Sequence, residues 1–238
     1  MADPFRLRYG SPVTEALSFL DPISRIPGVR AAWIGRLPDV EVAVDRDEAM
    51  TRLRHAHATV VAEFAGERAS WWRAEQVHGN SVAVVPGAET VLAADGLPVV
   101  PGVDGLVTNQ PGVVLAIYVA DCGAIWLADR KTGAIGLLHS GKKGTEGDIF
   151  GVALATMALE FGTRPEDVTA VLGPCIRPPQ YEIDFAAEIG RQAARAGIAD
   201  FTDCGENTAA DLSRHYSYRM ELGKTGRMMA LIVRDFPV

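Results

Sequence analysis

Three side chains of metal-binding type stand at points where predicted strands or turns end. Cys122 follows an apolar run at 113–120, and His139 directly follows another at 134–138. His78 opens the turn-forming sequence His78-Gly79-Asn80. Because the three residues are 44 and 17 positions apart along the chain, only the fold can bring them together. Polar residues at the ends of buried strands are where a rigid scaffold presents chemistry, so this is a candidate site.

Two imidazoles and one thiolate are ligands that suit zinc. Three protein ligands leave a fourth position for water or substrate, which is the arrangement of catalytic zinc sites. Zinc bound in this way lowers the pKa of its water toward ~7 and supplies a nucleophile at neutral pH. His78, Cys122 and His139 are therefore candidate metal ligands and candidate catalytic residues.

The same residues allow three other interpretations. Cys122 as a thiolate nucleophile, with His139 as its base, would make a cysteine hydrolase. Two histidines and one cysteine also match a blue-copper electron-transfer centre. A purely structural role is the third: Cys122 would be a small buried hydrophobe and each histidine a hydrogen-bonded turn residue. Composition and spacing alone leave these alternatives open.

A second feature begins at His139, in the sequence His139-Ser-Gly-Lys-Lys-Gly144. A glycine-flanked loop with Lys142 and Lys143, directly before a helix N-terminus, can hold an anion through backbone N–H groups, the helix dipole and ammonium charge. It is not a Walker A motif, because the spacing and the Ser/Thr position differ. A solvated basic turn is the alternative. An anion site beside His139 would suit a reaction in which phosphate is the co-substrate.

The composition is that of an ordinary globular protein. The 238 residues are 48% hydrophobic and 22% charged, and a chain of this length can form a substantial core. The net charge of -7 argues against broad nucleic-acid binding, which needs a cationic surface. A local basic patch could still bind a small anion.

Targeting features are missing from the sequence. The first residues, MADPFRLRYGSPVTEALSF, have no basic start followed by a long apolar core, so they do not resemble a secretory signal. The apolar run at 113–120 is too short to cross a bilayer. Cys122, Cys175 and Cys204 are an odd number without a close pair, which argues against a disulfide framework. We therefore expect a cytoplasmic protein without a membrane partner.

Short apolar runs predict the buried strands. Those at 113–120, 124–128 and 134–138 are rich in Val, Ile and Leu and bounded by Gly, Asp or Lys. Two strands joined by a turn at His78-Gly79-Asn80 are expected within 68–85, followed by a loop at 86–101. Further strands are expected at 29–34, 168–172 and 226–234, and residues 104–108 lead into the central three.

Three helices are predicted. The segment 45–65 has acidic residues early and arginines later, as the helix dipole favours, and Met50, Leu53, His57 and Val60 share one face. Capping-box spacing from Thr145 to Asp148 introduces a helix to about 161, which is apolar nearly all round and so should be buried. A third helix is expected at 184–196. With no linker or repeat, the chain is predicted to form one mixed α/β domain over 1–238.

An ordered set of short motifs resembles the YfiH family, which has been called a laccase-domain or polyphenol oxidase family and, more recently, a family of purine nucleoside phosphorylases. Each motif alone is weak, but the set is specific and spans about residues 70–235. The motifs are QVHG at 76–79, DGLVT at 104–108, ADC at 120–122, HSGKKG at 139–144, GPCI at 173–176, YEI at 181–183, YSYR at 216–219 and TGRMMALI at 225–232.

The resemblance implies a zinc site formed by His78, Cys122 and His139, and phosphorolysis of adenosine, inosine and methylthioadenosine, with adenosine deamination as a side activity. It also implies an α+β fold, with a mixed β-sheet core and packed helices, similar to the catalytic domain of a deamidating bacterial toxin. That likeness keeps the Cys122–His139 hydrolase interpretation open. The implied partners are a purine nucleoside and phosphate, not nucleic acid.

This sequence departs from the family pattern at several positions. The family's turn usually has the sequence HAGWRG, so Lys142 replaces Trp and Lys143 replaces Arg, which keeps charge without the bidentate fork. An Arg-Gly-Gly element near the N-terminus survives only as Ser24-Arg25-Ile26-Pro27-Gly28, and the segment between YEI and YSYR is shorter. Arg25 and Arg219 are further candidates for contacting phosphate or ribose.

Copper is a less favoured cofactor than zinc. A multicopper oxidase needs many imidazoles, and this chain has five histidines in all. No methionine lies between Cys122 and His139 to supply an axial ligand. The sequence therefore favours a zinc-dependent purine nucleoside phosphorylase, with a cysteine hydrolase or deamidase and a copper-dependent polyphenol oxidase as alternatives.

Overall fold

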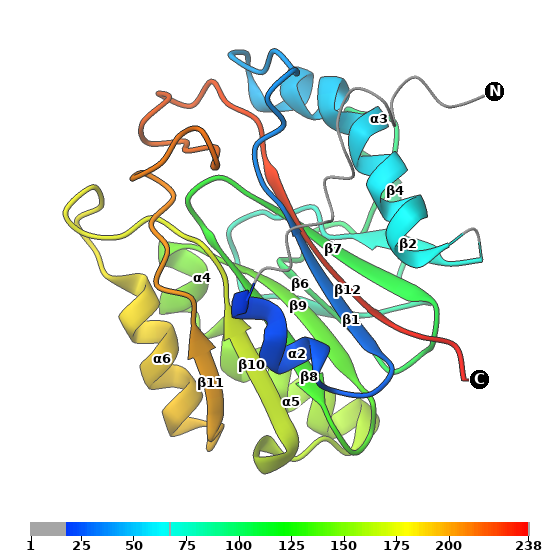
Figure 1. Ribbon diagram of the computed structural model, residues 1–238. Coiled ribbons are helices and arrows are strands. Elements are labelled where there is room, and N and C mark those ends of the chain that lie inside the picture. Colours follow the sequence, from blue (N-terminus) through cyan, green and yellow to red (C-terminus); the bar gives the residue numbers. More distant parts are fainter. Residues whose placement is uncertain (1–17, 67, 238) are drawn as a thin grey trace.

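The computed structural model describes residues 18–66 and 68–237 (Figure 1). The expectation that the first residues form no secretory signal falls mainly on 1–17, outside this part. Elements in chain order are η1 (Ser18–Leu20), α2 (Asp21–Ser24), β1 (Val29–Ile34), α3 (Arg46–Ala65), β2 (Ser70–Arg73), β3 (Val82–Val84), β4 (Val91–Leu92), β5 (Pro98–Val99), β6 (Gly105–Thr108), β7 (Val113–Val119), β8 (Gly123–Asp129), β9 (Ile135–Ser140), α4 (Lys142–Glu146), α5 (Ile149–Phe161), η2 (Pro165–Asp167), β10 (Val168–Leu172), α6 (Phe185–Arg195), β11 (Asp200–Asp203) and β12 (Met228–Arg234).

Two mixed sheets pack face to face. One has the strand order β1-β12-β7-β2 and the other β11-β10-β8-β9-β6-β3. Trp126 of β8 crosses the interface, where its indole N–H donates to the carbonyl of Leu231 on β12 at 2.9 Å. α3 covers the outer face of the first sheet, and α5 and α6 cover the second (Figure 1). This α+β architecture agrees with the predicted fold class.

The three central apolar runs form β7, β8 and β9, and every residue in these strands is buried. Apolar side chains therefore point into both layers, as continuous hydrophobic runs require. The predictions for β1 and β10 are confirmed at both ends, and β12 begins two residues later than expected. The loop predicted at 86–101 holds the short antiparallel pair β4 and β5.

The two strands predicted within 68–85 exist, but they belong to different sheets. β2 runs parallel to β7, whereas β3 runs parallel to β6. Residues 74–81 therefore cross from one sheet to the other. Gln76 fixes this crossing, because its amide N–H donates to the carbonyl of Tyr118 at 2.5 Å and its amide oxygen accepts from the N–H of Tyr118 at 2.9 Å.

The helix predictions are confirmed for α3 and α6, which are capped by Asp45 and Asp184. The capping box for α5 is wrong, since α4 already occupies 142–146 and Asp148 is the N-cap, accepting from the N–H of Gly151 at 3.2 Å. The expected burial of α5 on all sides is also wrong. Leu159 is 83% exposed, because one face of the helix has no layer above it.

His57 of α3 makes stability sensitive to acid. It is 1% exposed, packs on the ring of Tyr118, and among the described residues neither ring nitrogen has a hydrogen-bond partner. Burial, and then the charge of Arg73, lower the pKa of His57 to about 3. The folded state therefore resists protonation, while the unfolded chain takes up a proton below a pKa of ~6.5.

We expect the free energy of unfolding to fall as the pH drops below ~6.5, with His57 contributing a loss of about 2 kcal/mol at pH 5 relative to pH 7.5. In chemical denaturation, the free energy of unfolding of His57→Leu should fall by about 2 kcal/mol less than that of the wild type between pH 7.5 and pH 5. His55→Leu, two residues away and exposed, serves as the control. Equal pH dependence in the wild type and His57→Leu would contradict this account.

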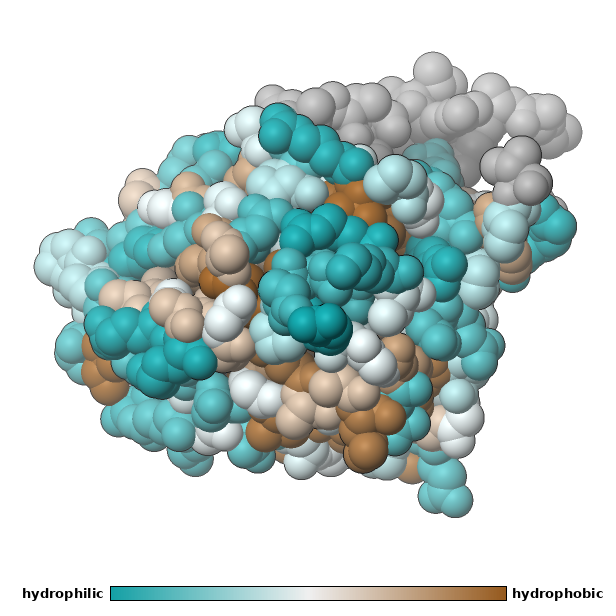
Figure 2. Space-filling view, turned by 90° about the horizontal axis from the view of Figure 1, so that it is seen from below, coloured by the Kyte–Doolittle hydropathy of each residue, from teal (hydrophilic) through white to brown (hydrophobic). Residues whose placement is uncertain are grey.

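The described helices include none that is long and apolar enough to cross a bilayer. All three cysteines are unpaired, as expected. Figure 2 shows one face of the molecule, on which hydrophilic residues predominate and hydrophobic ones lie in separate groups.

Candidate metal centre

His78, Cys122 and His139 converge on one point. One potential ligand atom from each side chain lies within 4.8 Å of the others. The imidazole rings of His78 and His139 meet nearly at right angles, with their centroids 4.9 Å apart. His139 is buried, Cys122 is half-buried and His78 is exposed, so the group opens to solvent on the side of His78.

Strand register places two of the three residues. Gly123 of β8 pairs with Ser140 of β9, so Cys122, just before β8, lies beside Gly141, just after β9. His139 is adjacent in the same pairing, opposite Ala124. The third residue, His78, is delivered by the crossing between the sheets. A separation of 44 residues is thereby closed by the sheet topology.

Asp104 orients both histidines. Its buried carboxylate pairs with Nδ1 of His139 at 2.7 Å and accepts from the backbone N–H groups of His78 at 2.9 Å and Gly79 at 2.7 Å. Since Nδ1 of His139 faces the carboxylate, Nε2 is left to face the cluster. A carboxylate behind a histidine is the common outer partner of metal-bound imidazoles. Sequence reasoning missed this role, although Asp104 opens the DGLVT motif.

The electrostatics of the site favour a thiolate. Burial raises the pKa of Cys122, but the charges and hydrogen bonds of His139 and His78 outweigh it and lower the pKa to about 6. Burial lowers the pKa of His139, but Cys122 and Asp104 outweigh it and raise the pKa to about 9. Asp104 has a lowered pKa, because hydrogen bonds from His139 and the backbone exceed the effect of burial. The thiolate is the form of cysteine that binds a metal or acts as a nucleophile.

Asp121 holds the turn that presents Cys122. Its carboxylate accepts from the hydroxyls of Thr208 at 2.7 Å and Ser217 at 3.0 Å and from the N–H of Arg219 at 2.7 Å. Asp121 has a φ of 82° and His78 a φ of 63°, both in the left-handed region. Such conformations cost on the order of 1 kcal/mol each and persist where surrounding bonds hold them. The site is therefore rigidly braced.

Gly141 leaves room for the sulfur of Cys122. A Cβ at this position would lie 2.6 Å from Sγ. We expect Gly141→Ala to displace the sulfur, to weaken metal binding by the cluster at least about tenfold and to lower stability by ~1–3 kcal/mol. Chelator competition and denaturation measure these effects. Gly190→Ala is the control, since its Cβ would meet Phe201 at an ordinary 3.5 Å. Metal binding by Gly141→Ala at wild-type affinity would contradict the expected displacement of the sulfur.

The two lysines predicted in a basic loop lie instead in a helix. Lys142 and Lys143 are the first residues of α4, both exposed, and follow Gly141 at the sulfur of Cys122. The predicted loop was therefore wrong, because the helix begins at Lys142 rather than after Gly144. Lys142 and Lys143 therefore place positive charge next to Gly141, at the rim of the site.

Arg219 also lies at the rim. Its guanidinium pairs with Glu182 at 2.9 Å and stacks over the ring of Tyr181 at 4.9 Å from the centroid. Its backbone N–H is one of the donors to Asp121, which links it to the turn before Cys122. Arg219 is thus close to the centre but already engaged with protein groups.

Arg25 lies elsewhere. It follows α2, its side chain is 79% exposed, and it pairs with Asp21 at 3.9 Å. β1 begins shortly afterwards at Val29, opposite Arg234, whereas the residues near Cys122 lie at the other end of β12. The structure does not bring Arg25 to the other candidates, and it takes no part in the function proposed below.

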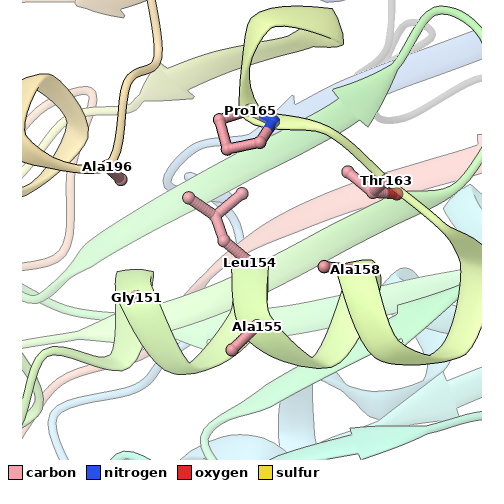
Figure 3. Close-up of a pocket in the computed structure, with 7 residues that line it drawn as sticks. All are labelled: Gly151, Leu154, Ala155, Ala158, Thr163, Pro165 and Ala196. Atoms are coloured by element: carbon pink, nitrogen blue, oxygen red, sulfur yellow. The ribbon is translucent and has the colours of Figure 1, made fainter.

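A separate apolar pocket lies between α5 and the segment before β10 (Figure 3). It carries no titratable or metal-binding side chain. Its lining residues are Gly151, Leu154, Ala155, Ala158, Thr163, Pro165 and Ala196. The chemistry of the described residues is therefore concentrated at the His78-Cys122-His139 group and not in this pocket.

The fold and the site define a class of protein: a two-sheet α+β sandwich with a His-Cys-His group beside the paired strands β8 and β9. A family model described as multi-copper polyphenol oxidoreductase laccase matches residues 35–190 and 182–235. The chain belongs to this family, which is the YfiH family that its motifs resemble.

Several relatives carry the name purine nucleoside phosphorylase. One from Deinococcus radiodurans is 40% identical over 156 residues, which are 54% of this chain and 60% of that protein. One from Streptomyces griseus is 33% identical and covers 75% of this chain and 70% of its own length. The chain thus spans less than two thirds of the Deinococcus protein.

Solved structures share the fold. YlmD from Geobacillus stearothermophilus matches with a TM-score of 0.74 and 24% identity, covering 91% of this chain and 94% of its own. YfiH from Bacillus licheniformis matches with a TM-score of 0.72 and 21% identity, covering 86% and 92%. At these identities the likeness establishes the fold.

Proposed function

We propose that this protein is a zinc-dependent purine nucleoside phosphorylase acting on adenosine, inosine and methylthioadenosine. The observation that carries the proposal is the convergence of His78, Cys122 and His139 within 4.8 Å in a chain whose relatives bear that name. The substrates would be a purine nucleoside and phosphate, and adenosine deamination would be a side activity.

The donor set fits zinc. Tetrahedral zinc with one sulfur and two nitrogens would hold its ligand atoms on the order of 3.5 Å apart, so a small contraction of the present group suffices. Within 18–66 and 68–237 it is the one cluster of at least three such ligands. Of the other histidines, two lie on α3, and His215 lies 3.2 Å from Glu206. The described residues therefore contain no second histidine cluster that could form a multicopper centre.

Bound zinc would act as a Lewis acid and lower the pKa of a bound water. The chain's own residues perform the remaining tasks. Asp104 holds His139 in one orientation, and Asp121 fixes the turn of Cys122. Lys142, Lys143 and Arg219 would place positive charge at the rim, where an anionic co-substrate would approach.

Product analysis tests the function. The zinc-loaded protein is incubated with adenosine, inosine or methylthioadenosine, with and without phosphate, and the products are separated by chromatography. We expect free base and ribose 1-phosphate, or its methylthio analogue, only when phosphate is present. Inosine formed from adenosine regardless of phosphate would indicate deamination instead, and no turnover of any nucleoside would reject the enzyme assignment.

A cysteine hydrolase is the second candidate, and one observation favours it. Cys122, His139 and Asp104 are arranged as nucleophile, base and orienting carboxylate. Metal analysis separates the two functions. A metal-free protein that is active and is inactivated by a thiol alkylator would support the hydrolase, whereas activity that follows zinc content supports the phosphorylase.

We also propose that residues 1–238 form one domain, since both sheets contribute to a shared core. Cytoplasmic function is a further proposal, supported by three unpaired cysteines, which fit a reducing compartment. Copper-dependent oxidation of phenols is a weaker alternative, which zinc-free, copper-loaded protein would test.

A further inference from the structure

Arg227 carries a half-buried positive charge beside the candidate metal centre. It directly precedes β12, in which Met228 pairs with Val119, so Arg227 lies level with Ala120, two residues before Cys122. Its Nη1 donates to the carbonyls of Thr225 at 3.0 Å and Gly226 at 2.9 Å. These bonds fix the guanidinium against its own backbone and leave Nε and Nη2 for another acceptor.

The charge of Arg227 has no carboxylate partner in the described part of the chain. Arg36, Arg73 and Arg177 are also buried or half-buried, and each pairs with an acid. Arg234, half-buried and also without a carboxylate partner, lies at the other end of β12. A half-buried cation without a counter-ion is costly, which suggests that an anionic ligand completes this position.

Arg46 adds a second positive charge that acts on Arg227. It is the first residue of α3, is exposed, and donates one N–H to the carbonyl of Glu75 at 3.0 Å. Burial, and then the charge of Arg46, lower the pKa of Arg227. The carboxylate of Asp121, which is also near, is already held by three donors. The thiolate of Cys122 is also near and favours the charged guanidinium, but it is a candidate metal ligand and so is engaged with the cluster. In the described part of the chain neither Arg227 nor Arg46 is hydrogen-bonded to a carboxylate, although the whole chain has a net charge of -7.

We propose that Arg227, assisted by Arg46, forms a phosphate subsite beside the His78-Cys122-His139 group. Guanidinium forks match the oxygens of phosphate and hold them by charge-assisted hydrogen bonds. The position differs from the expected anion site at Lys142 and Lys143, because those lysines lie on α4 whereas Arg227 directly precedes β12. The inference rests on the proposed function in one respect, that phosphate is the co-substrate.

Calorimetric titration of inorganic phosphate into the zinc-loaded full chain tests the subsite directly, without turnover. We expect Arg227→Gln to weaken phosphate binding at least about tenfold and Arg46→Gln to weaken it severalfold. Arg164→Gln is the control, because Arg164 is an exposed arginine beside η2. This variant should bind phosphate as tightly as the wild type. Lys143→Gln tests the competing site and should have a smaller effect than Arg227→Gln.

Zinc content and thermal unfolding establish that each variant is folded and loaded. If Arg227→Gln does not fold, Arg227→Lys replaces it, and loss of the fork should still weaken phosphate binding severalfold. Wild-type affinity in the folded Arg227 variant, or no phosphate binding by the wild type at millimolar concentration, would overturn the subsite. Phosphate binding that depends on Arg227, in a protein that cleaves no nucleoside, would support the subsite and reject the proposed function.

Discussion

Replacing Cys122 by alanine should abolish the proposed stoichiometric zinc binding and reduce the proposed phosphorolysis at least about a thousandfold. The thiolate is one of three side chains that meet within 4.8 Å, and its lowered pKa makes it the anionic donor of the set. Structural zinc sites are bound with ~10–16 kcal/mol, so one ligand of three accounts for about 4 kcal/mol, or roughly three orders of magnitude in affinity. Metal analysis after dialysis and a phosphorolysis assay measure the two effects.

Cys204→Ala is the control for this substitution. Cys204 is also half-buried, but its sulfur accepts from the N–H of Glu206 at 3.4 Å and it is outside the cluster. Zinc content should be unchanged in this variant. Retention of one tightly bound zinc by Cys122→Ala would remove Cys122 from the ligand set, and loss of activity without loss of zinc would favour its role as a nucleophile.

Replacing Asp104 by asparagine should weaken zinc binding about 10- to 100-fold and also destabilise the fold by ~3–5 kcal/mol. The carboxylate is hydrogen-bonded to Nδ1 of His139 and accepts hydrogen bonds from two backbone N–H groups, those of His78 and Gly79. An amide has one acceptor oxygen in place of two, so at least one of these buried donors loses its partner. Chelator competition gives the zinc affinity, and urea denaturation of the zinc-free protein gives the stability.

Asp129→Asn provides the comparison. Asp129 is a buried carboxylate at the last residue of β8, and it accepts from the N–H of Lys131 at 2.8 Å and the hydroxyl of Thr132 at 2.7 Å in the turn that leads to β9. This variant should lose stability while keeping its zinc affinity, because Asp129 is the last residue of β8 and Cys122 directly precedes the first. If Asp104→Asn binds zinc as tightly as Asp129→Asn does, Asp104 stabilises the fold without orienting His139.

Much of the framework could be predicted from local sequence. The limits of β1 and β10 follow from apolar runs bounded by turn residues. α3 follows from its early acidic residues, later arginines and a shared face of apolar residues. The candidate ligands could be identified because histidine and cysteine are rare side chains at strand ends. These features depend on a few neighbouring residues, which the sequence displays directly.

Other features depend on contacts between distant segments. Asp104 gains its role only because β6 pairs with β9, and Asp121 because the segment at 208–219 folds back on its turn. The N-cap of α5 moved to Asp148 because α4 takes up the preceding residues. Arg25 was a candidate on its motif alone, and β-strand register places it at the far end of the sheet. Long-range pairing is not encoded in a short window.

X-ray absorption at the zinc edge of the stoichiometrically loaded protein is the most direct test of the metal centre. We predict one zinc ion per chain with one sulfur ligand at about 2.3 Å and two imidazole nitrogens at about 2.0–2.1 Å. Zinc without a sulfur ligand, or a purified chain that holds no tightly bound metal after loading, would contradict the convergence of His78, Cys122 and His139 on a metal ion.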